Sequence, residues 1–400
     1  MHCTRKSEGN VTGRRLPAIR TALAIALAGA SGLWAGAAQA ASISSIYGVK
    51  LSIGASAQGQ RNSRLFQINA ATNTVNSIVV ARLGGATVYL DGLAISSTGD
   101  LYGFVADNAA GTGNVDGLTP PATPAQAPNN YRSRLVSVDP ATGTLTAVGA
   151  QRTGAVHSGA AFNLADQLWA LNHYATTLER IDPATGTVLQ TVPVTLPAGG
   201  AWPNTLTADL AFDVDDTAFL ALGADIYRVD LATGNATLVV NRPSDGYLAL
   251  GFYRNNEVWS IEANGLDDVR YAASGDVSAW ATVPGLGDLS TTVGNANSGA
   301  MDFASVPNRV TATPDAYVLD VNSPGITLNP LARASNVRNW PMTLNVLTGP
   351  TQGTLDTSGT LPVYIPAPNY VGPDSFTYQA CTLPTGTCAT SSAPKNIPFA

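Results

Sequence analysis

The sequence predicts an all-β chain in which a β-propeller, a ring of four-stranded sheets, precedes a small β-sandwich. Alternating apolar runs separated by turn residues extend from about Ser42 to Ser305, and no apolar 3.6-residue period covers a helix length. One turn motif recurs at a period of about forty residues, which is typical of propeller repeats. The repeat stops near Val306-Pro307, and short predicted strands with Gly and Pro turns follow.

The recurring motif is Asp-Pro-Ala-Thr-Gly. It occurs at 139–143 and 182–186, as Asp-Leu-Ala-Thr-Gly at 230–234, and in a looser form at 69–73. The Asp side chain can bond the backbone two residues on, Pro presets φ, and Gly supplies the positive φ that closes a turn. Because alternating apolar runs flank each copy, the motif predicts the turn of a β-hairpin.

A second predicted hairpin precedes each copy of this motif. Its first strand is small and apolar, as at 159–162 and 209–212, and its second strand carries one large ring: Tyr102, Trp169, Phe219 and Trp259. Two hairpins make one four-stranded blade. We expect the small strand to lie near the central axis and the large ring to fill the space between neighbouring blades.

The two ends of the repeat region complete each other. Residues 46–80 offer a blade without its innermost strand, and 298–303 offer an innermost strand without its blade. Joining them closes the ring and removes open edges. This count gives five blades, and six are possible if the interval 107–130, which we interpret as an inserted surface loop, contains strands.

The first forty residues predict a secretory signal. Basic residues precede an apolar run from Ala22 to Trp34, and Ala38-Gln39-Ala40 follows as a cleavage site. An uncleaved anchor is the alternative, although the run is shorter than the ~20 residues of a membrane span.

Five of the 21 basic and one of the 27 acidic residues lie in this predicted signal, so the remainder of the chain carries a net charge of about −10. That acidity argues against nucleic acid or anionic lipid as a partner, and we expect a secreted, periplasmic or cell-surface protein.

Two cysteines remain after the signal, Cys381 and Cys388, on either side of a Pro-Thr-Gly turn. A pair of cysteines in a secreted protein predicts a disulfide. The alternative, a metal site, would need further ligands, and neither His nor a second Cys pair stands nearby in the sequence.

Segments 349–355 and 364–378 of the C-terminal module resemble bacterial Ig-like and cadherin-like domains. Members of these families carry an acidic stretch that is associated with calcium, but the matching residues 331–337 here contain no carboxylate, so the resemblance implies no calcium site. The repeats themselves resemble those of secreted bacterial propeller proteins, which indicates the fold rather than the activity. We expect a signal at 1–40, a propeller at 41–305, a linker at 306–314 and an Ig-like sandwich at 315–400.

Polar residues stand where the innermost strands are expected to begin. We predict that they line one mouth of the central channel and bind a ligand: Asp91, His157, Asp209, Tyr247 and Ser298. This ring of polar side chains resembles that of propeller enzymes such as the calcium-dependent lactonases, which hold a metal at the channel mouth. The alternative is a set of solvated loop residues, and the Glu and Asn pattern of those lactonases is absent.

Other polar and aromatic residues have simpler interpretations. We expect His173 to be an exposed turn residue and Asp213, Asp215 and Asp216 to form a tight turn, with a cation site as the alternative for the aspartates. Ring side chains in predicted loops could grip sugars or peptides or cap the core: Tyr131, Tyr174, Trp202 and Tyr247. The sequence has no Gly-x-Ser-x-Gly nucleophile elbow.

Since the sequence assembles no catalytic set, we expect a binding or surface-interaction protein without catalysis. It would be a monomer without a cofactor, and its partner would be a glycan, a peptide or an envelope component. The alternative is a propeller hydrolase or lyase with a divalent cation such as calcium at the channel mouth. A purely structural envelope component is the third interpretation.

Overall fold

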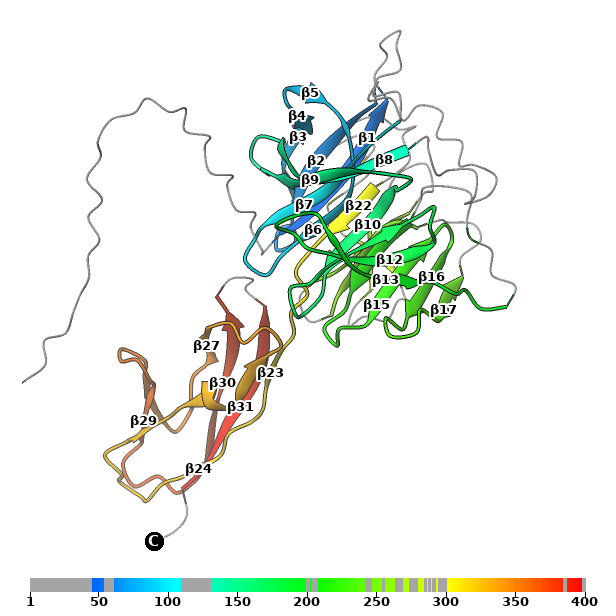
Figure 1. The fold of residues 1–400 in the computed structure, drawn as a ribbon. Helices are drawn as coiled ribbons and strands as arrows, with labels where there is room; N and C mark the ends of the chain where they lie inside the picture. Colours follow the sequence, from blue (N-terminus) through cyan, green and yellow to red (C-terminus); the bar gives the residue numbers. More distant parts are fainter. Residues whose placement is uncertain are drawn as a thin grey trace, which may run out of the picture. The chain divides into compact units, whose positions relative to one another are not determined.

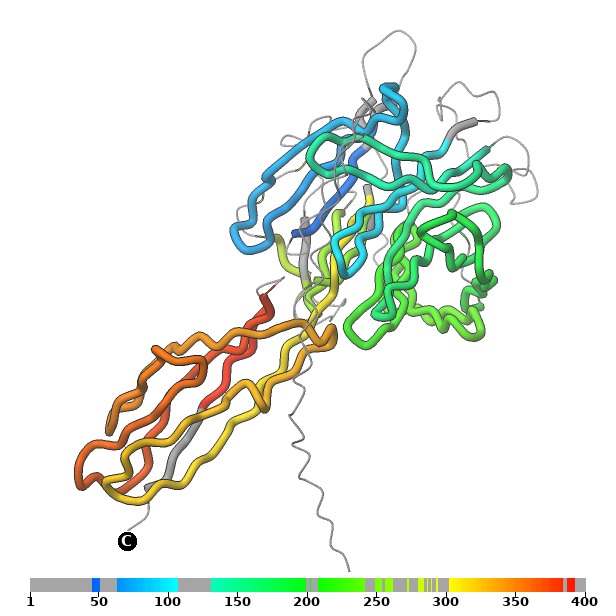
Figure 2. Tube along the Cα trace, turned by 60° about the vertical axis from the view of Figure 1, so that its left-hand side comes forward, coloured from blue at the N-terminus to red at the C-terminus, as the bar shows by residue number. Residues whose placement is uncertain are grey.

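The computed structural model describes residues 45–53, 61–108, 131–198, 202, 208–241, 247–253, 256–262, 269–272, 280–283, 286, 289, 293, 301–383 and 387–397. These residues form an all-β structure (Figures 1 and 2). The predicted signal, most of the predicted surface loop and Ser298 lie outside them. No helix within the described ranges is long and apolar enough to cross a membrane.

Five sheets form the N-terminal part. The first has the order β22-β1-β2-β3, with bounds Met301–Ala304, Ile46–Ile53, Arg61–Asn69 and Thr74–Val80. The second has the order β5-β4-β9-β8-β7-β6, with bounds Ala86–Thr87, Arg82–Leu83, Thr144–Thr153, Tyr131–Val138, Leu101–Asn108 and Tyr89–Ile95.

The other three sheets each run in chain order from the innermost strand outward. The third comprises β10 (His157–Phe162), β11 (Leu168–Asn172), β12 (Thr177–Ile181) and β13 (Val188–Pro193). The fourth comprises β14 (Ala208–Phe212), β15 (Ala218–Leu222), β16 (Asp225–Val229) and β17 (Ala236–Asn241). The fifth comprises β18 (Tyr247–Phe252), β19 (Val258–Glu262), β20 (Val269–Ala272) and β21 (Ala281–Thr282).

The innermost strands form a closed ring. In the order β6, β10, β14, β18 and β22 each contacts the next, and β22 contacts β6 again. Strand β22 pairs antiparallel with β1, with Gly48 opposite Phe303. The predicted closure of the ring by its two ends is confirmed. The described residues contain five such sheets, in agreement with the favoured count, and the number of blades in the whole chain stays a prediction.

The apolar core lies between neighbouring sheets. Ala94 and Phe104 of the second sheet pack with Ala160 and Phe162 of the third in one buried cluster. The Tyr102 ring lies 5.7 Å from that of Phe162, and the Phe219 ring lies 5.0 Å from that of Phe252. The large rings of the second strands therefore fill the junctions between blades, as the sequence predicts.

The Asp-Pro-Ala-Thr-Gly motif forms the predicted hairpin turn. At Asp139 the carboxylate accepts hydrogen bonds from Ala141 N at 2.9 Å and Thr142 Oγ1 at 2.9 Å, and Gly143 has φ 73°. The turn also contacts the segment that directly follows β3, the outer strand of the first sheet, because Arg82 N in β4 donates to Gly143 O at 2.9 Å. Thr195 N donates to Gly234 O at 2.9 Å in the same way two blades later. The repeated turn therefore joins neighbouring blades at their outer strands.

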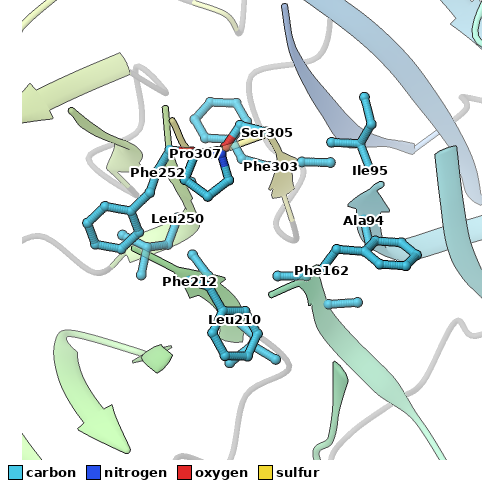
Figure 3. A pocket seen from close by; sticks show the side chains of 15 residues that line it. Ala94, Ile95, Phe162, Leu210, Phe212, Leu250, Phe252, Phe303, Ser305 and Pro307 are labelled. Carbon is cyan, nitrogen blue, oxygen red and sulfur yellow. Dashed lines mark hydrogen bonds between the residues drawn. The ribbon is translucent and has the colours of Figure 1, made fainter. Parts of the chain in front are cut away.

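The downstream ends of the innermost strands enclose a small apolar cavity. Figure 3 shows side chains from these strands converging on it: Ala94, Ile95, Phe162, Leu210, Phe212, Leu250, Phe252 and Phe303. Ser305 and Pro307 also line it, together with small residues of the same strands. The cavity offers almost no hydrogen-bonding side chain, so we place the candidate site at the other end of the strands.

The C-terminal module comprises three small sheets. Their orders are β24-β31-β30-β27, β25-β29-β28 and β23-β26. The strand bounds in chain order are Val310–Ala312 (β23), Tyr317–Val318 (β24), Ile326–Thr327 (β25), Ala334–Asn336 (β26), Met342–Thr348 (β27), Gly353–Asp356 (β28), Val363–Pro366 (β29), Gly372–Thr382 (β30) and Cys388–Ile397 (β31). A 3₁₀ turn, η3, covers Pro330–Arg333. Tyr364, Phe376 and Tyr378 are fully buried in the core of this module.

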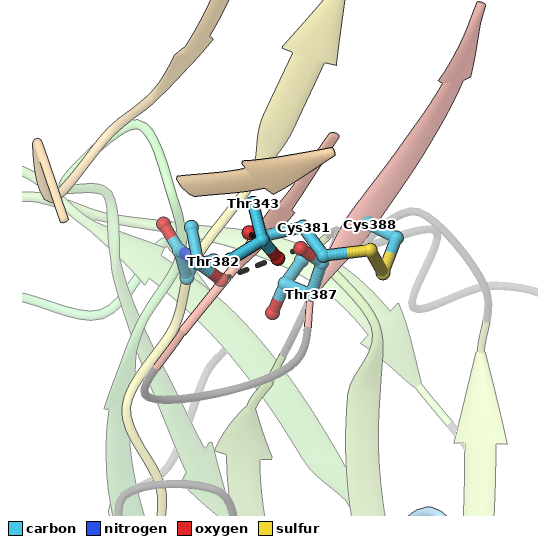
Figure 4. The surroundings of a disulfide bond; sticks show 6 residues. Thr343, Cys381, Thr382, Thr387 and Cys388 are labelled. Atoms are coloured by element: carbon cyan, nitrogen blue, oxygen red, sulfur yellow. Dashed lines mark hydrogen bonds between the residues drawn. A yellow bond between two sulfur atoms is a disulfide. The ribbon is translucent and has the colours of Figure 1, made fainter. Parts of the chain in front are cut away.

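Cys381 and Cys388 form the predicted disulfide. The two residues lie opposite each other at the end of the β30–β31 hairpin (Figure 4). Thr382 N next to them donates to Thr387 O at 2.9 Å, so the hairpin end is fixed by the bond and by the ladder together.

Candidate functional site

The structure places the side chains of three of the five predicted channel residues, and these three do not lie in one cluster. Asp91 lies in β6, His157 begins β10, Asp209 lies in β14 and Tyr247 begins β18. Asp91, His157 and Asp209 are buried in strands, so for them the alternative of solvated loop residues is wrong. They divide between two polar clusters, one at the axis and one at a junction between blades.

The first cluster comprises three buried carboxyl groups, Asp91, Asp209 and Asp302, which we call the axial carboxyls. Asp209 Oδ1 accepts from Leu210 N at 2.6 Å, and its Oδ2 accepts from Leu250 N at 2.6 Å and from Phe303 N at 3.3 Å. Asp209 thereby connects β14 to β18 and β22 across the ring.

The other two axial carboxyls extend this connection. Asp302 Oδ2 accepts from Leu93 N, which links β22 to β6. Asp91 accepts from Tyr89 Oη at 2.8 Å and from Gly92 N at 3.0 Å. The edge of each innermost strand that faces the axis has no strand partner. The buried amide hydrogens along this edge therefore need other acceptors. The carboxyl groups supply these acceptors, which favours a structural role for the axial cluster.

Burial raises the pKa of the axial carboxyls. The pKa of Asp91 rises to about 8 and that of Asp209 to about 7, because water that would solvate the charge is excluded. Burial and the neighbouring Asp209 also raise the pKa of Asp302. Among the residues that the structure describes, no three His, Cys, Asp or Glu side chains are arranged to hold a metal ion.

The aspartates at 213–216 form a turn, as predicted. Asp213 Oδ1 accepts from Asp215 N at 2.9 Å and from Thr217 N at 2.8 Å. This side chain satisfies the backbone between β14 and β15 and needs no cation to explain its position.

The second cluster lies where β10 begins and β11 ends, which we call the His157 end. We call its five residues the His157 cluster: Ser133, Arg152, His157, Asn172 and Glu179. They come from five successive strands, β8 to β12, so the cluster spans the junction between the second and third sheets.

A chain of hydrogen bonds runs through the His157 cluster. Ser133 Oγ lies 2.9 Å from His157 Nδ1, and His157 Nε2 lies 3.1 Å from Glu179 Oε2. Arg152 Nη2 donates to Glu179 Oε1 at 3.1 Å, and Nη1 donates to Oε2. Asn172 Nδ2 also donates to Glu179 Oε1, at 3.1 Å. The Phe104 ring stacks on the imidazole at 4.2 Å.

This geometry fixes the protonation states. Burial lowers the pKa of His157, although Glu179 opposes the shift, so the imidazole is neutral at neutral pH. Burial alone would raise the pKa of Glu179, but hydrogen bonds from His157 and Arg152 outweigh it and lower that pKa well below its ordinary value. The cluster therefore pairs a neutral imidazole with a carboxylate.

The preceding blade shows that the fold does not require these polar residues. His157 pairs with Asn172 as Leu90 pairs with Val105 in the second sheet. Glu179 pairs with Ala170 as Val136 pairs with Gly103. Three apolar positions of one blade are thus polar in the next. The sequence carried this signal in Leu178-Glu179-Arg180-Ile181 beside Leu135-Val136-Ser137-Val138, where a charge interrupts the apolar alternation.

Aromatic side chains lie beside the His157 cluster. The Tyr131 and Tyr174 rings stack at 5.2 Å, and the His173 ring contacts that of Trp202 at 5.8 Å. Tyr131 begins β8 instead of lying in a loop, and His173 is 2% exposed, so its interpretation as an exposed turn residue is wrong. Tyr131 and Trp202 are partly exposed. Three buried atoms here have no hydrogen-bond partner in the described part of the chain: Asn172 Oδ1, Thr177 Oγ1 and Trp202 Nε1.

Comparison with known proteins assigns one module. A family model for the bacterial Ig domain matches residues 305–394, which supports the predicted Ig-like character of the C-terminal module. No curated protein matches the chain.

Several solved structures are similar to the chain. Virginiamycin B lyase from Staphylococcus aureus is 14% identical over 60% of this chain and 70% of its own, with a TM-score of 0.33. Glutaminyl cyclase from Myxococcus xanthus is 13% identical over 56% and 88%, with a TM-score of 0.33. A protein of unknown function from Bacteroides caccae is 11% identical over 64% and 98%, with a TM-score of 0.34.

Proposed function

We propose that the protein is an extracellular binding protein whose ligand site is the His157 end of the propeller. The observation that carries this proposal is the replacement of three apolar junction positions by His157, Asn172 and Glu179 beside partly exposed aromatic rings. Polar residues that the fold does not require concentrate at functional sites. The disulfide and the bacterial Ig domain are consistent with an extracellular location.

The ligand chemistry that best fits this end is an uncharged glycan. Tyr131 and Trp202 offer ring faces that cover the apolar side of a sugar. The unpaired Asn172 Oδ1, Thr177 Oγ1 and Trp202 Nε1 offer acceptors and donors for hydroxyl groups. Arg152 and Glu179 neutralise each other, so the described residues of the His157 cluster offer no net charge that would select an ionic ligand.

Binding of the full-length protein to a glycan array, with a peptide array in parallel, tests this proposal. We expect glycan binding that Trp202→Ala and Tyr131→Ala each weaken about tenfold or more, because central aromatic anchors carry most of the binding energy. The matched control is Leu189→Ala, since Leu189 is an exposed apolar residue on the outer strand β13. Peptide binding alone would overturn the ligand class, and glycan binding unchanged in both ring variants would overturn the location.

A further inference from the structure

We propose that Ser133, His157 and Glu179 form a nucleophile, base and carboxylate set that hydrolyses an acyl ester carried by the bound molecule. The inference rests on the proposed site at the His157 end and adds a reaction to it. It needs neither a glycan nor any particular ester, only a carbonyl carbon that reaches Ser133 Oγ.

The hydrogen-bond directions fit this chemistry. Glu179 is an acceptor only, so its hydrogen bond with His157 requires the proton of the neutral imidazole on Nε2. Arg152 Nη1, 3.3 Å from the same nitrogen, then donates to Glu179 Oε2 instead of Nε2. Nδ1 is then the acceptor for the Ser133 hydroxyl at 2.9 Å. Serine, imidazole and carboxylate in this order make a general base that is held in the correct tautomer. Arg152 and Asn172 hold the carboxylate from its other side.

An equivalent serine in another blade shows what the fold alone requires. Ser63 and Ser133 each begin a Ser-Arg-Leu triplet on the third strand of a blade. Ser63 Oγ donates to Leu90 O at 3.0 Å and accepts from Leu90 N at 2.8 Å, so it bonds only the backbone of the next innermost strand. Ser133 faces His157, the residue equivalent to Leu90, and bonds the imidazole instead. At the same position of the blade, Ser63 therefore bonds the backbone of Leu90, whereas Ser133 bonds an imidazole that can act as a base.

Ser133 lies one side-chain layer below the surface. Tyr131 is two residues earlier on the same side of β8 and is partly exposed. The Arg152 side chain is 33% exposed and reaches Glu179 and His157 from the solvent side. Ser133 itself is 1% exposed, so a substrate has to reach its hydroxyl past these two more exposed residues.

The reaction balances with water as the second reactant. Ser133 Oγ forms a bond to the ester carbonyl carbon while its proton moves to His157 Nδ1. The carbon–alkoxy bond then breaks, and the leaving alcohol takes that proton. Water attacks the resulting acyl-serine and gives a proton to His157 Nδ1, which returns it to Ser133 Oγ as the carboxylic acid leaves. Glu179 stays ionised throughout and stabilises the transient imidazolium.

A fluorophosphonate probe, which reacts covalently with activated serines, tests the inference on the full-length protein. We expect one adduct, located on Ser133 by peptide mass spectrometry. Ser133→Ala should abolish labelling, and Glu179→Gln should slow it about 100-fold or more. Ser63→Ala is the matched control, because Ser63 occupies the equivalent position without a base, and it should label at the rate of the unmodified protein.

A second variant separates catalysis from structure. The triple substitution His157→Leu, Asn172→Val and Glu179→Val introduces the residues of the preceding blade, Leu90, Val105 and Val136. A buried polar network replaced by packed apolar residues is often as stable or more stable, so we expect an unchanged or higher thermal midpoint together with no labelling.

Two results would overturn the inference. One is a folded unmodified protein that the probe does not label at Ser133, and the other is labelling that Glu179→Gln and the triple substitution leave unchanged. Both results are independent of glycan binding, because the probe carries no sugar. Conversely, a labelled Ser133 without array binding would refute the proposed ligand and leave the reaction in place.

Discussion

At the scale of single residues, the His157 cluster is a polar network inside an apolar junction, and Asn172 Oδ1 is its unpaired atom among the described residues. Glu179 is 4% exposed and receives hydrogen bonds from Arg152, His157 and Asn172. A buried carboxylate is tolerated only when such partners replace its lost hydration. Removal of one member should therefore have the opposite effect from the joint replacement of His157, Asn172 and Glu179 by apolar residues.

We expect Glu179→Gln to lower the free energy of unfolding by about 2 kcal/mol. The substitution removes the charge that Arg152 pairs with, and the partial exposure of Arg152 moderates the cost. Urea denaturation followed by tryptophan fluorescence measures the difference, with Asp320→Asn at an exposed carboxylate as the control. A Glu179→Gln protein as stable as the control would show that the network contributes nothing to stability.

The sequence singled out His157, although as a residue of the channel mouth, and it missed the partners of His157 for a physical reason. A serine, an arginine and a glutamate on three different strands are unrelated in sequence spacing, and only the pairing register brings them to one imidazole. At the axis, β-bulges between Asp91 and Ala94 and between His157 and Ala160 shift which residue points inward. Asp302 was assigned to the closing strand at 298–303, but nothing in that stretch shows that its carboxyl group bonds the backbone of β6.

At the scale of elements, the Asp-Pro-Ala-Thr-Gly turns have two roles. Their Asp and Thr side chains close the hairpin, as the sequence predicts. Their glycines lie against the outer strand of the preceding blade, which the sequence could not show because the contact joins different repeats. A Cβ atom on Gly186 would lie 2.8 Å from Val148 O, closer than real Cβ atoms approach an oxygen.

We predict that Gly186→Ala destabilises the protein more than Gly84→Ala does. Both glycines have positive φ, 70° and 59°, but a Cβ atom at Gly84 would meet no atom within 4 Å. Strain alone should cost about 1–2 kcal/mol at either position, and the contact with Val148 should add about 1 kcal/mol or more at Gly186. Chemical denaturation of both variants gives the comparison. Equal losses would mean that the blades do not depend on this contact.

At the scale of the whole molecule, the ring is joined both by strand pairing and by the axial carboxyls. The sequence predicted the repeats, the closing strand and the second module because each depends on local patterns. It placed Asp91 and Asp209 at an open mouth, whereas both are buried among backbone amides. Burial on the axis depends on all blades together, and no single repeat records it.

Because the axial carboxyls hold protons in the folded protein, we expect the free energy of unfolding to fall as the pH rises from about 4 to about 8. Their folded pKa values, about 8 for Asp91, about 7 for Asp209 and raised for Asp302, exceed the value of 3.8 for an ordinary Asp. In this range the folded protein keeps protons that the unfolded chain releases, so the free energy of unfolding decreases by about 1.4 kcal/mol per pH unit for each such proton. The lowered pKa of His157 acts in the opposite direction below about pH 6.5.

Comparison with Asp302→Asn isolates the axial contribution. The amide mimics the protonated acid and does not titrate, so the free energy of unfolding of this variant should fall less steeply with pH than that of the unmodified protein. Urea denaturation at half-unit steps from pH 4 to pH 8 measures both profiles. Parallel profiles would show that Asp302 holds no proton in this range.

The closing strand β22 has a mechanical consequence. Because β22 ends at Ala304 and the Ig match begins at residue 305, any tension transmitted through the C-terminal module enters the propeller at this strand. The seam between β22 and β1 is short, with four paired residues on each side. A pulling force would load this seam before any continuous hairpin of the ring, so the propeller would open at the place where its two ends meet.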